Sequence, residues 1–591
     1  MQRKYLSRIT RPVPASLAYL APTASLPRPG MLRKSILCAT FACLVLSLAA
    51  CGGAGKQAVT TPPANTHFPT ALEIAPAVSL QSVGATQQFK ATATFNDATT
   101  RDVTGLSVWA SNANSVATIT QLSGLESAVG AGDVTISATF GMAGETVTAS
   151  FLVHVTATPL QSIAVVPSGG ILELGTNQQF GAIGTFADGT THILTPLVAW
   201  STTDPAVLQV NTTPQRIGQG YTRGPGDVRI VVKLNGVSGE ATVSVVRRVP
   251  KFLYTAGLSG IEGFSIDSTS GRLTPATGSK FTAVGTILSL AVTRDQKFLY
   301  AADSVLGVVW GFQIGAAGEL TPLPDGPFST SVTSSPVSVV AHPTADFLFM
   351  TDANAREITT FSIGANGSLT ALPPANLANT NLLSANTSPD GRFFYQALHV
   401  GAAASIPAFS IAADGTLSAV PGDPASTGFI PKALAVDPSG RFLYAVISSS
   451  SLGPSTSVFG YSIDPVNGAL TQIGVAPFTA GENPTSAAVD ASGRFLYVTN
   501  GANSAGGNSV TGFSIDEDIG ALIELQGSPF PASISPVSVM VEPGAQFAYV
   551  GLDGTQGVRV FTIDQLTGAL SEVRGSPSPT DVGALAMVAT Y

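Results

Sequence analysis

Two nearly identical stretches decide the fold of this chain: residues 437–446 read DPSGRFLYAV, and residues 490–499 read DASGRFLYVT. An aromatic triplet like their FLY recurs at intervals of 46 to 53 residues. Its copies begin at Phe252, Phe298, Phe347, Phe393, Phe442, Phe495 and Phe547. Each copy is followed by an apolar segment of the GFSID type and then by a G-x-L turn. The chain therefore contains seven copies of one structural unit.

The repeated unit has the length and the pattern of a β-propeller blade. An inner strand such as PKALAVDPS comes first, a tight turn leads into the FLY strand, and two more strands follow. The last residues, 584–591, have the pattern of an inner strand, but no further strands of a blade follow them. We therefore expect them to complete the blade that begins at residue 251. This arrangement removes exposed sheet edges. It predicts a seven-bladed propeller over residues 249–591, closed by the C-terminal strand.

The decisive stretch itself is best interpreted as scaffold. Pro438, Ser439 and Gly440 form the turn between the inner and second strands, where glycine tolerates positive φ. Phe442 and Tyr444 share one face of the strand and should pack between blades. The copying is thus explained by a ring of similar sheets, with no ligand required.

Two shorter repeats precede the propeller. GATQQFKATATF at 84–95 and GTNQQFGAIGTF at 175–186 are related by an offset of 91 residues, as are Trp109 and Trp200. Each copy has short alternating strands separated by Gly, Asn and Asp turns, which is typical of a β-sandwich with a buried tryptophan. The whole chain is therefore expected to be all-β, with Ig-like sandwiches over residues 71–157 and 158–248 ahead of the propeller.

Composition and charge exclude several classes of protein. The 591 residues carry a formal net charge of −8 and only 11% charged residues, which argues against a phosphate-neutralising surface for nucleic acid. The three cysteines, Cys38, Cys43 and Cys51, all lie near the N-terminus. The folded body therefore has neither a disulfide framework nor a metal site built from cysteine.

The first 50 residues form the expected signal region. Arg33 and Lys34 precede an apolar run of 13 residues, from Ile36 to Leu48, and we expect translation to start at Met31. The segment ends in LAAC, which resembles the bacterial lipobox, and that resemblance implies lipidation of Cys51. A plain secretory signal is the alternative. Residues 51–70 then form a flexible tether. We expect an exported protein held by its lipid in the bacterial envelope, in the outer membrane or at the cell surface.

Both folded parts resemble known families. The G-x-x-Q-x-F strand and the following Trp make each sandwich similar to the bacterial Ig-like group 2 family, whose members commonly act as spacers or adhesive modules. The unit P-x-x-x-x-V-x-P-x-G-R-F-L-Y-V-x-N resembles the seven-bladed lactonase-like propellers, the 6-phosphogluconolactonase and carboxymuconate-cyclising group, and the YVTN surface-layer repeats. The resemblance implies either lactone hydrolysis or a role at the cell surface.

The catalytic motif that this resemblance implies is absent. The enzymes carry Pro-Arg-His at the start of an inner strand and Asn-Glu after the F-x-Y strand, so that these groups meet at the mouth of the central channel. Here residues 431–433 read Pro-Lys-Ala, and no blade has Asn-Glu. We therefore assign no catalytic residue, and we expect no cofactor and no metal.

Five residues remain as candidates for binding at the channel mouth: Lys432, Glu482, Asn483, His342 and His399. His342 takes the turn position of Asp437 and Asp490, and His399 follows a strand, so both also fit ordinary turn or loop roles. The leading hypothesis is a non-enzymatic lipoprotein whose propeller, on an Ig-like stalk, binds a protein or a glycan. The alternatives are a diverged lactonase-type hydrolase and a structural surface-layer component.

Overall fold

The computed structural model describes residues 68–591, apart from residues 76–79, 98, 143, 283–284, 330–333, 378–380, 401–402, 422–424, 448–455, 502–506, 533–534 and 555. Within these residues the regular structure is all strand except for one 3-10 turn, η1 (Thr104–Leu106), which confirms the all-β prediction. The signal region, Cys51 and nearly all of the tether lie outside the described residues. Among the residues described, no helix has the length and apolar character needed to cross a membrane.

The first sandwich consists of three small sheets, in the orders β1-β4-β5, β2-β10-β9-β6 and β3-β8-β7. Its strands are β1 (Pro69–Ala75), β2 (Leu80–Ser82), β3 (Thr86–Gln88), β4 (Lys90–Phe95), β5 (Thr100–Asp102), β6 (Val108–Ser111), β7 (Ala117–Ile119), β8 (Leu125–Ala128), β9 (Gly132–Met142) and β10 (Glu145–Thr156). Along β9 every second residue from Val134 to Phe140 is buried, because alternate side chains of a strand face the core.

The second sandwich repeats this topology, in the orders β11-β14-β15, β12-β20-β19-β16 and β13-β18-β17. Its strands are β11 (Leu160–Val166), β12 (Gly169–Glu173), β13 (Asn177–Gln179), β14 (Gly181–Phe186), β15 (Thr191–Ile193), β16 (Ala199–Thr202), β17 (Leu208–Val210), β18 (Gln219–Thr222), β19 (Gly226–Leu234) and β20 (Val237–Val246). Trp109 and Trp200 are buried, and their indole Nε1–H groups donate to the carbonyls of Thr104 and Thr195. Both tryptophans therefore anchor their cores as predicted.

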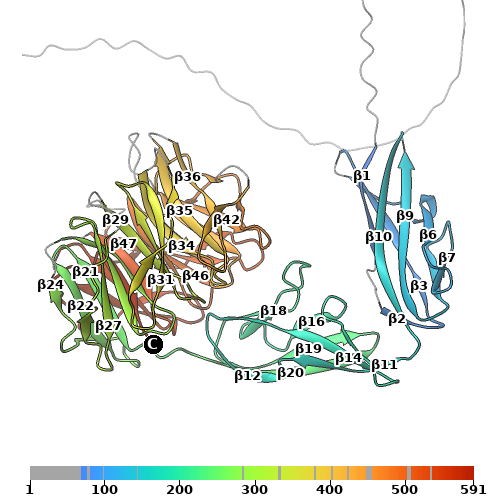
Figure 1. Cartoon of the computed structure of the whole chain (residues 1–591), viewed down its shortest axis with the longest axis horizontal. Helices are drawn as coiled ribbons and strands as arrows, with labels where there is room; N and C mark the ends of the chain where they lie inside the picture. Colours follow the sequence, from blue (N-terminus) through green and yellow to red (C-terminus); the bar gives the residue numbers. More distant parts are fainter. Residues whose placement is uncertain are drawn as a thin grey trace, which may run out of the picture. The chain divides into compact units, whose positions relative to one another are not determined.

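Seven sheets form the propeller, which runs from green to red in Figure 1. The inner strands are β25 (Ile287–Val292), β29 (Pro336–Ala341), β34 (Asn381–Thr387), β40 (Pro431–Val436), β45 (Pro484–Val489), β50 (Pro536–Val541) and β54 (Ala586–Ala589). The second strands are β21 (Phe252–Gly257), β26 (Phe298–Asp303), β30 (Phe347–Asp352), β35 (Phe393–Val400), β41 (Phe442–Ile447), β46 (Phe495–Asn500) and β51 (Phe547–Leu552).

The outer half of each blade is built from shorter strands. The third strands are β22 (Gly260–Ile266), β27 (Val308–Ile314), β31 (Glu357–Ile363), β36 (Ala403–Ile406) with β37 (Ala408–Ile411), β42 (Ser457–Ile463), β47 (Ser509–Ile515) and β52 (Val558–Ile563). The outer strands are β23 (Leu273–Pro275), β28 (Leu320–Pro322), β32 (Leu369–Ala371), β38 (Leu417–Ala419), β43 (Leu470–Gln472), β48 (Leu522–Glu524) and β53 (Leu570–Glu572). Two-residue strands extend five blades: β24 (Phe281–Thr282), β33 (Ala375–Asn376), β39 (Ala425–Ser426), β44 (Phe478–Thr479) and β49 (Phe530–Pro531).

The C-terminal strand closes the ring. β54 pairs antiparallel with β21, so that Val588 lies opposite Tyr254. The inner strands contact one another in a complete cycle, β54, β25, β29, β34, β40, β45 and β50, and β50 in turn contacts β54. The first blade is therefore shared between the two ends of the propeller sequence, as predicted.

The conserved spacing of the repeat has a direct steric cause. The glycine of each G-x-L turn has φ between +70° and +84°, and a Cβ added to it would lie 2.4–2.7 Å from the phenylalanine ring that begins an FLY-type strand. In six blades the tyrosine of that strand donates its hydroxyl to the same glycine's carbonyl. The pairs are Tyr254–Gly318, Tyr300–Gly367, Tyr395–Gly468, Tyr444–Gly520, Tyr497–Gly568 and Tyr549–Gly271. The FLY strand of each blade therefore packs against the G-x-L turn of the next blade, which confirms that the FLY stretch is scaffold.

Candidate functional site

The central channel has two chemically different mouths. The inner strands all begin at one end, where the second strands also finish, and we call this end the upper mouth. At the other end, the lower mouth, each inner strand except β54 is joined to its second strand by a turn such as 437–441. The two mouths are separated by the length of the inner strands, so residues at one cannot share a site with residues at the other.

The upper mouth brings together three of the five candidate residues. Lys432 is the second residue of β40, while Glu482 and Asn483 come directly before β45, the neighbouring inner strand. The Lys432 side chain is exposed, yet protein atoms surround it on the channel wall, and this desolvation lowers the pKa of its ammonium group. No hydrogen bond or ion pair to Lys432 occurs among the described residues. Lys432 is therefore a cation open to a ligand.

The polar residues at the ends of the second strands serve as structural caps. The Asp303 carboxylate accepts hydrogen bonds from the backbone N–H groups of Val305 and Leu306, at 3.1 and 3.0 Å. Asp352 accepts from the backbone N–H groups that follow it, and Asn500 donates to two hydroxyls on β47. All three are fully buried. Asp303 and Asp352 thus hold the turns that follow their strands, while Asn500 ties β46 to β47.

The structure places the two candidate histidines at opposite mouths of the channel. His399 lies on β35, opposite Asn381, where this strand continues past the usual end at the upper mouth. His342 lies instead in the turn after β29, at the lower mouth. Its Nδ1 accepts hydrogen bonds from the backbone N–H groups of Thr344 and Ala345, so its Nε2–H donates to the Gly391 carbonyl at 2.9 Å. Burial lowers the pKa of His342. His342 is thus a turn cap that does not share a site with Lys432.

At the lower mouth the second sandwich contacts the propeller. Arg216 donates to the carbonyls of Ser439 and Gly440, at 3.1 and 2.9 Å. The amide of Asn177 donates to the carbonyl of Pro438 at 3.1 Å. The repeated DPSGR turn, interpreted from the sequence as scaffold, is therefore also a docking point. On the propeller side these contacts are made by backbone carbonyls. Because every residue has a carbonyl, the sequence could not predict this docking point.

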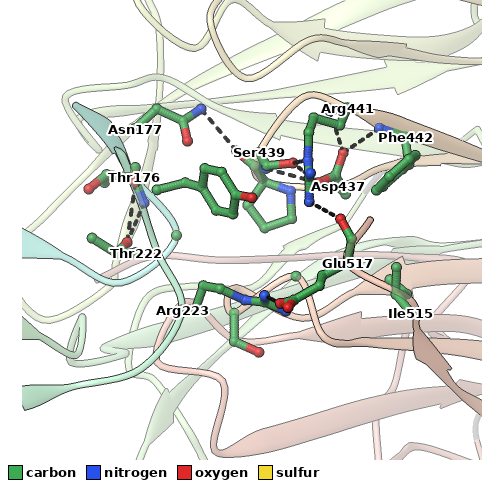
Figure 2. Close-up of a pocket in the computed structure, with 15 residues that line it drawn as sticks. Thr176, Asn177, Thr222, Arg223, Asp437, Ser439, Arg441, Phe442, Ile515 and Glu517 are labelled. Atoms are coloured by element: carbon green, nitrogen blue, oxygen red, sulfur yellow. Dashed lines mark hydrogen bonds and ion pairs between the residues drawn. The ribbon is translucent and has the colours of Figure 1, made fainter. Parts of the chain in front are cut away.

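A small pocket lies within this joint (Figure 2). Arg223 forms an ion pair with Glu517, and the Arg441 guanidinium lies 5.0 Å from the ring centre of Tyr221. The cavity holds only about 10 Å³, which is the space of one water molecule. This pocket is a packed interface between the sandwich and the propeller, with no room for a ligand.

The family of the chain follows from its repeats. The family model described as "Lactonase, 7-bladed beta-propeller" matches residues 253–376, 368–476 and 452–584, more than half of the chain. The chain belongs to the seven-bladed lactonase propeller family. A second model, "Bacterial Ig-like domain (group 2)", matches residues 70–151. The lactonase-propeller resemblance is therefore confirmed, and the Ig-like resemblance is confirmed for the first sandwich.

Individual relatives of this lactonase-family chain match shorter segments. Ice-binding protein 1 of Shewanella frigidimarina is 39% identical over 144 residues, which are 24% of this chain and 16% of that protein. A 6-phosphogluconolactonase of Formosa agariphila is 41% identical over 91 residues, 15% of this chain and 23% of that protein. The chain thus spans less than a quarter of the length of these two relatives.

A solved structure supports the fold. A candidate 6-phosphogluconolactonase from Bacteroides uniformis aligns with a TM-score of 0.50 at 16% identity, covering 58% of this chain and 100% of that one. At this identity the likeness establishes the propeller architecture only, because the same fold serves many functions. The function of this lactonase-family propeller must therefore be argued from its own residues.

No described group of histidine, cysteine, aspartate and glutamate side chains has the arrangement of a metal site. The upper mouth thus offers this lactonase-family propeller one exposed cation, Lys432, with Glu482 and Asn483 on the adjoining blade. A cation of this kind can attract an anionic or hydroxyl-rich ligand, but a hydrolase also needs a group that activates water. At the neighbouring strand ends, the carboxylates of Asp303 and Asp352 cap turns.

Proposed function

We propose that this lactonase-family chain is an exported, lipid-anchored envelope protein whose propeller binds a protein or a glycan. One observation carries the proposal. At the upper mouth, where a hydrolase of this family would hold its reacting groups, Asp303 and Asp352 cap turns and Lys432 has no acidic partner among the described residues. Binding needs complementary groups only, whereas hydrolysis also needs a positioned acid or base.

The ligand-binding residues under this proposal are Lys432, Glu482 and Asn483, together with His399 on the extended strand β35 of the adjoining blade. Asn483 has φ of +50°, an unusual value for a residue other than glycine, and its carbonyl accepts a hydrogen bond from Gly501. Residues with sparsely populated backbone angles cluster at binding and active sites. This geometry supports a prepared binding surface at the start of β45.

The anchoring part of the proposal rests on the sequence. The LAAC tetrapeptide ends a signal-like segment, and the two sandwiches would act as spacers between the lipid and the propeller. The binding role agrees with the name of the Shewanella relative, an ice-binding protein, over the 144 residues that match. Labelling of growing cells with radioactive palmitate should mark the chain, and Cys51→Ser should abolish the label.

A glycan array tests the binding function. The full-length chain should bind one class of glycans on the array. Lys432→Ala should lower the affinity for these glycans by about 10-fold, the effect of losing one charge-assisted hydrogen bond. Lys280→Ala is the matched control, because Lys280 pairs with Asp581 on the propeller surface. If wild type and Lys432→Ala bind the glycans equally well, the ligand does not bind at the upper mouth.

A diverged lactone hydrolase is the second candidate. It is favoured by the family membership and by the lowered pKa of Lys432, because a neutral amine can accept a proton from water. Hydrolysis of glucono-δ-lactone and of 6-phosphogluconolactone should be followed with the full-length chain. A rate above that of buffer that disappears in Lys432→Ala would overturn the binding-only proposal.

A further inference from the structure

One sheet of the second sandwich forms its docking face for the propeller. The strands of this sheet have the order β13-β18-β17. Asn177 on β13 donates to a carbonyl of the propeller, and Tyr221 on β18 lies beside Arg441. Arg223, which directly follows β18, forms its ion pair with Glu517 (Figure 2). The outer face of this sheet is therefore an interface within the chain.

The first sandwich contains the same sheet, in the order β3-β8-β7. Its backbone hydrogen bonds repeat those of the second sandwich: the N–H of Val129 donates to the carbonyl of Val116, as the N–H of Arg223 donates to that of Val207. The strand registers agree as well. The positions therefore correspond in pairs: Val83 with Leu174, Thr86 with Asn177, Leu122 with Arg216, Leu125 with Gln219, Ser127 with Tyr221 and Val129 with Arg223.

The two equivalent faces differ in their exposure. Leu174 is only 1% exposed, and Ala491 and Val541 of the propeller pack in the same cluster. Val83, at the equivalent position of the first sandwich, is 43% exposed. Three more large apolar side chains on this face are exposed: Leu122 by 65%, Leu125 by 42% and Val129 by 53%. The face that the propeller covers in the second sandwich is thus open in the first.

The four apolar residues follow β8 from one end to the other. Leu122 lies in the hairpin between β7 and β8, Leu125 begins β8, and Val129 directly follows it. Val83 lies near the same end as Val129, because the turn after Val83 donates a backbone hydrogen bond to the carbonyl of Ala128. A row of exposed apolar residues, unlike a single one, indicates an interaction surface.

The residues exchanged between the two faces indicate which partner the open face can bind. Where Arg216 and Arg223 bind carbonyls and a carboxylate of the propeller, the first sandwich has Leu122 and Val129. The open face therefore lacks the cations that bind a propeller turn. Its other described positions carry neutral polar side chains: Thr86, Gln88, Thr118 and Ser127.

An uncharged face with an apolar row is suited to pairing with an identical face. In a dimer with two-fold symmetry the same surface is used by both subunits, so a charged residue near the axis would lie close to its own copy. Like charges brought together in this way weaken an interface. The row along β8 avoids that repulsion, and its leucine and valine side chains would be removed from water by pairing.

We propose that the open face of β3, β8 and β7 binds the same face of a second copy of this chain, which forms a two-fold dimer through the first sandwich. One three-stranded sheet offers a limited area, so the interface belongs to the small, reversible class. The dimer would carry two propellers, but the pairing does not depend on the function proposed for them.

Sedimentation velocity of the full-length chain in detergent, from about 1 μM to about 100 μM, tests the pairing. Val129→Arg gives this exposed position the residue of the second sandwich, so the fold should persist, and thermal unfolding checks that it does. Leu122→Arg is a second variant of the same kind. We expect wild type to show a reversible monomer–dimer equilibrium, and each variant to raise the dimer dissociation constant by about 10-fold or more.

Ile171→Arg is the matched control. Ile171 is 73% exposed on β12 of the second sandwich, away from the open face, so its replacement should leave the dissociation constant unchanged. The proposal is overturned if wild type stays monomeric at about 100 μM, a concentration at which a weak specific dimer forms. It is also overturned if Val129→Arg dimerises like wild type, as it would if the lipid or the micelle caused the association. Stronger association of Val129→Arg would mean that the face binds a propeller turn in the manner of Arg223, and would overturn the two-fold pairing.

Discussion

The hydroxyl of Tyr549 donates a hydrogen bond of 2.9 Å to the carbonyl of Gly271, which lies 278 residues earlier in the chain. This bond links the last complete blade to the first and belongs to the same series as Tyr444–Gly520. Gly271 has φ of +70°, and a Cβ there would lie 2.4 Å from the Phe547 ring. The ring of seven blades is thus closed by the same contact that joins its interior blades.

Gly271→Ala should destabilise the propeller by about 3 kcal/mol or more, because strain in the left-handed region adds to a clash with a packed ring. Calorimetry of the full-length chain measures the effect. Gly554→Ala is the control, since Gly554 has φ of +65° and open space around its Cβ direction. The control should cost only about 1 kcal/mol. If the two variants lose the same free energy of unfolding, the contact between Gly271 and the Phe547 ring does not contribute to stability.

Glu126 should make the first sandwich less stable as the pH rises. Its carboxyl is fully buried and its oxygens have no hydrogen-bond partner in the described structure, although the Gln81 amide lies nearby, and burial raises the pKa of Glu126. The folded state therefore holds its proton to higher pH than the unfolded state does. Stability is full below the ordinary glutamate pKa and falls as the pH rises through the raised value.

Glu126→Gln tests this pH dependence. The variant should be more stable than wild type at pH 8, by about 1–3 kcal/mol, and nearly equal to it at pH 4. Thermal unfolding of the first sandwich at the two pH values measures the difference. If the difference in stability between the variant and wild type is the same at both pH values, ionisation of Glu126 does not cause the loss of stability.

Arg216→Ala should loosen the joint between the second sandwich and the propeller. The half-buried guanidinium donates two hydrogen bonds to the 437–441 turn, and their loss should cost about 1–3 kcal/mol of docking free energy. Hydrogen exchange of peptides covering residues 216–223 and 437–441 should become faster. Arg229→Ala, which removes an exposed ion pair with Glu240 in the same sandwich, should leave exchange at the joint unchanged.

Lys432 should react with acetic anhydride at a lower pH than Lys280 does. Desolvation lowers the pKa of Lys432, whereas the side-chain hydrogen bond and charge of Asp581 raise the pKa of Lys280. Only the neutral amine is nucleophilic, so the labelling midpoint follows the pKa. Mass spectrometry of samples labelled at stepped pH gives both midpoints in one experiment. A midpoint for Lys432 at or above that of Lys280 would contradict the desolvation argument.

Much of the propeller could be predicted from local pattern. The FLY triplet and the G-x-L glycine recur because every blade meets its neighbour through the same steric contact, so the sequence repeats wherever the contact repeats. Trp109 and Trp200 marked the two sandwich cores for a similar reason. The grouping of Lys432 with Glu482 and Asn483 on neighbouring blades also followed from the repeat, and their role in binding stays a prediction.

The sequence by itself determined the two sandwiches, the seven blades and the closing strand, because these depend on short-range periodicity and on glycine and aromatic residues at fixed spacing. Only the tertiary structure decided that Arg216 reaches the turn at Ser439, that His342 lies at the mouth opposite Lys432, and that the propeller covers Leu174 of the second sandwich. These relationships join residues that are far apart in the chain, and the docking contact is made to backbone carbonyls. Every residue has a carbonyl, so no pattern of side chains can reveal where such a contact forms.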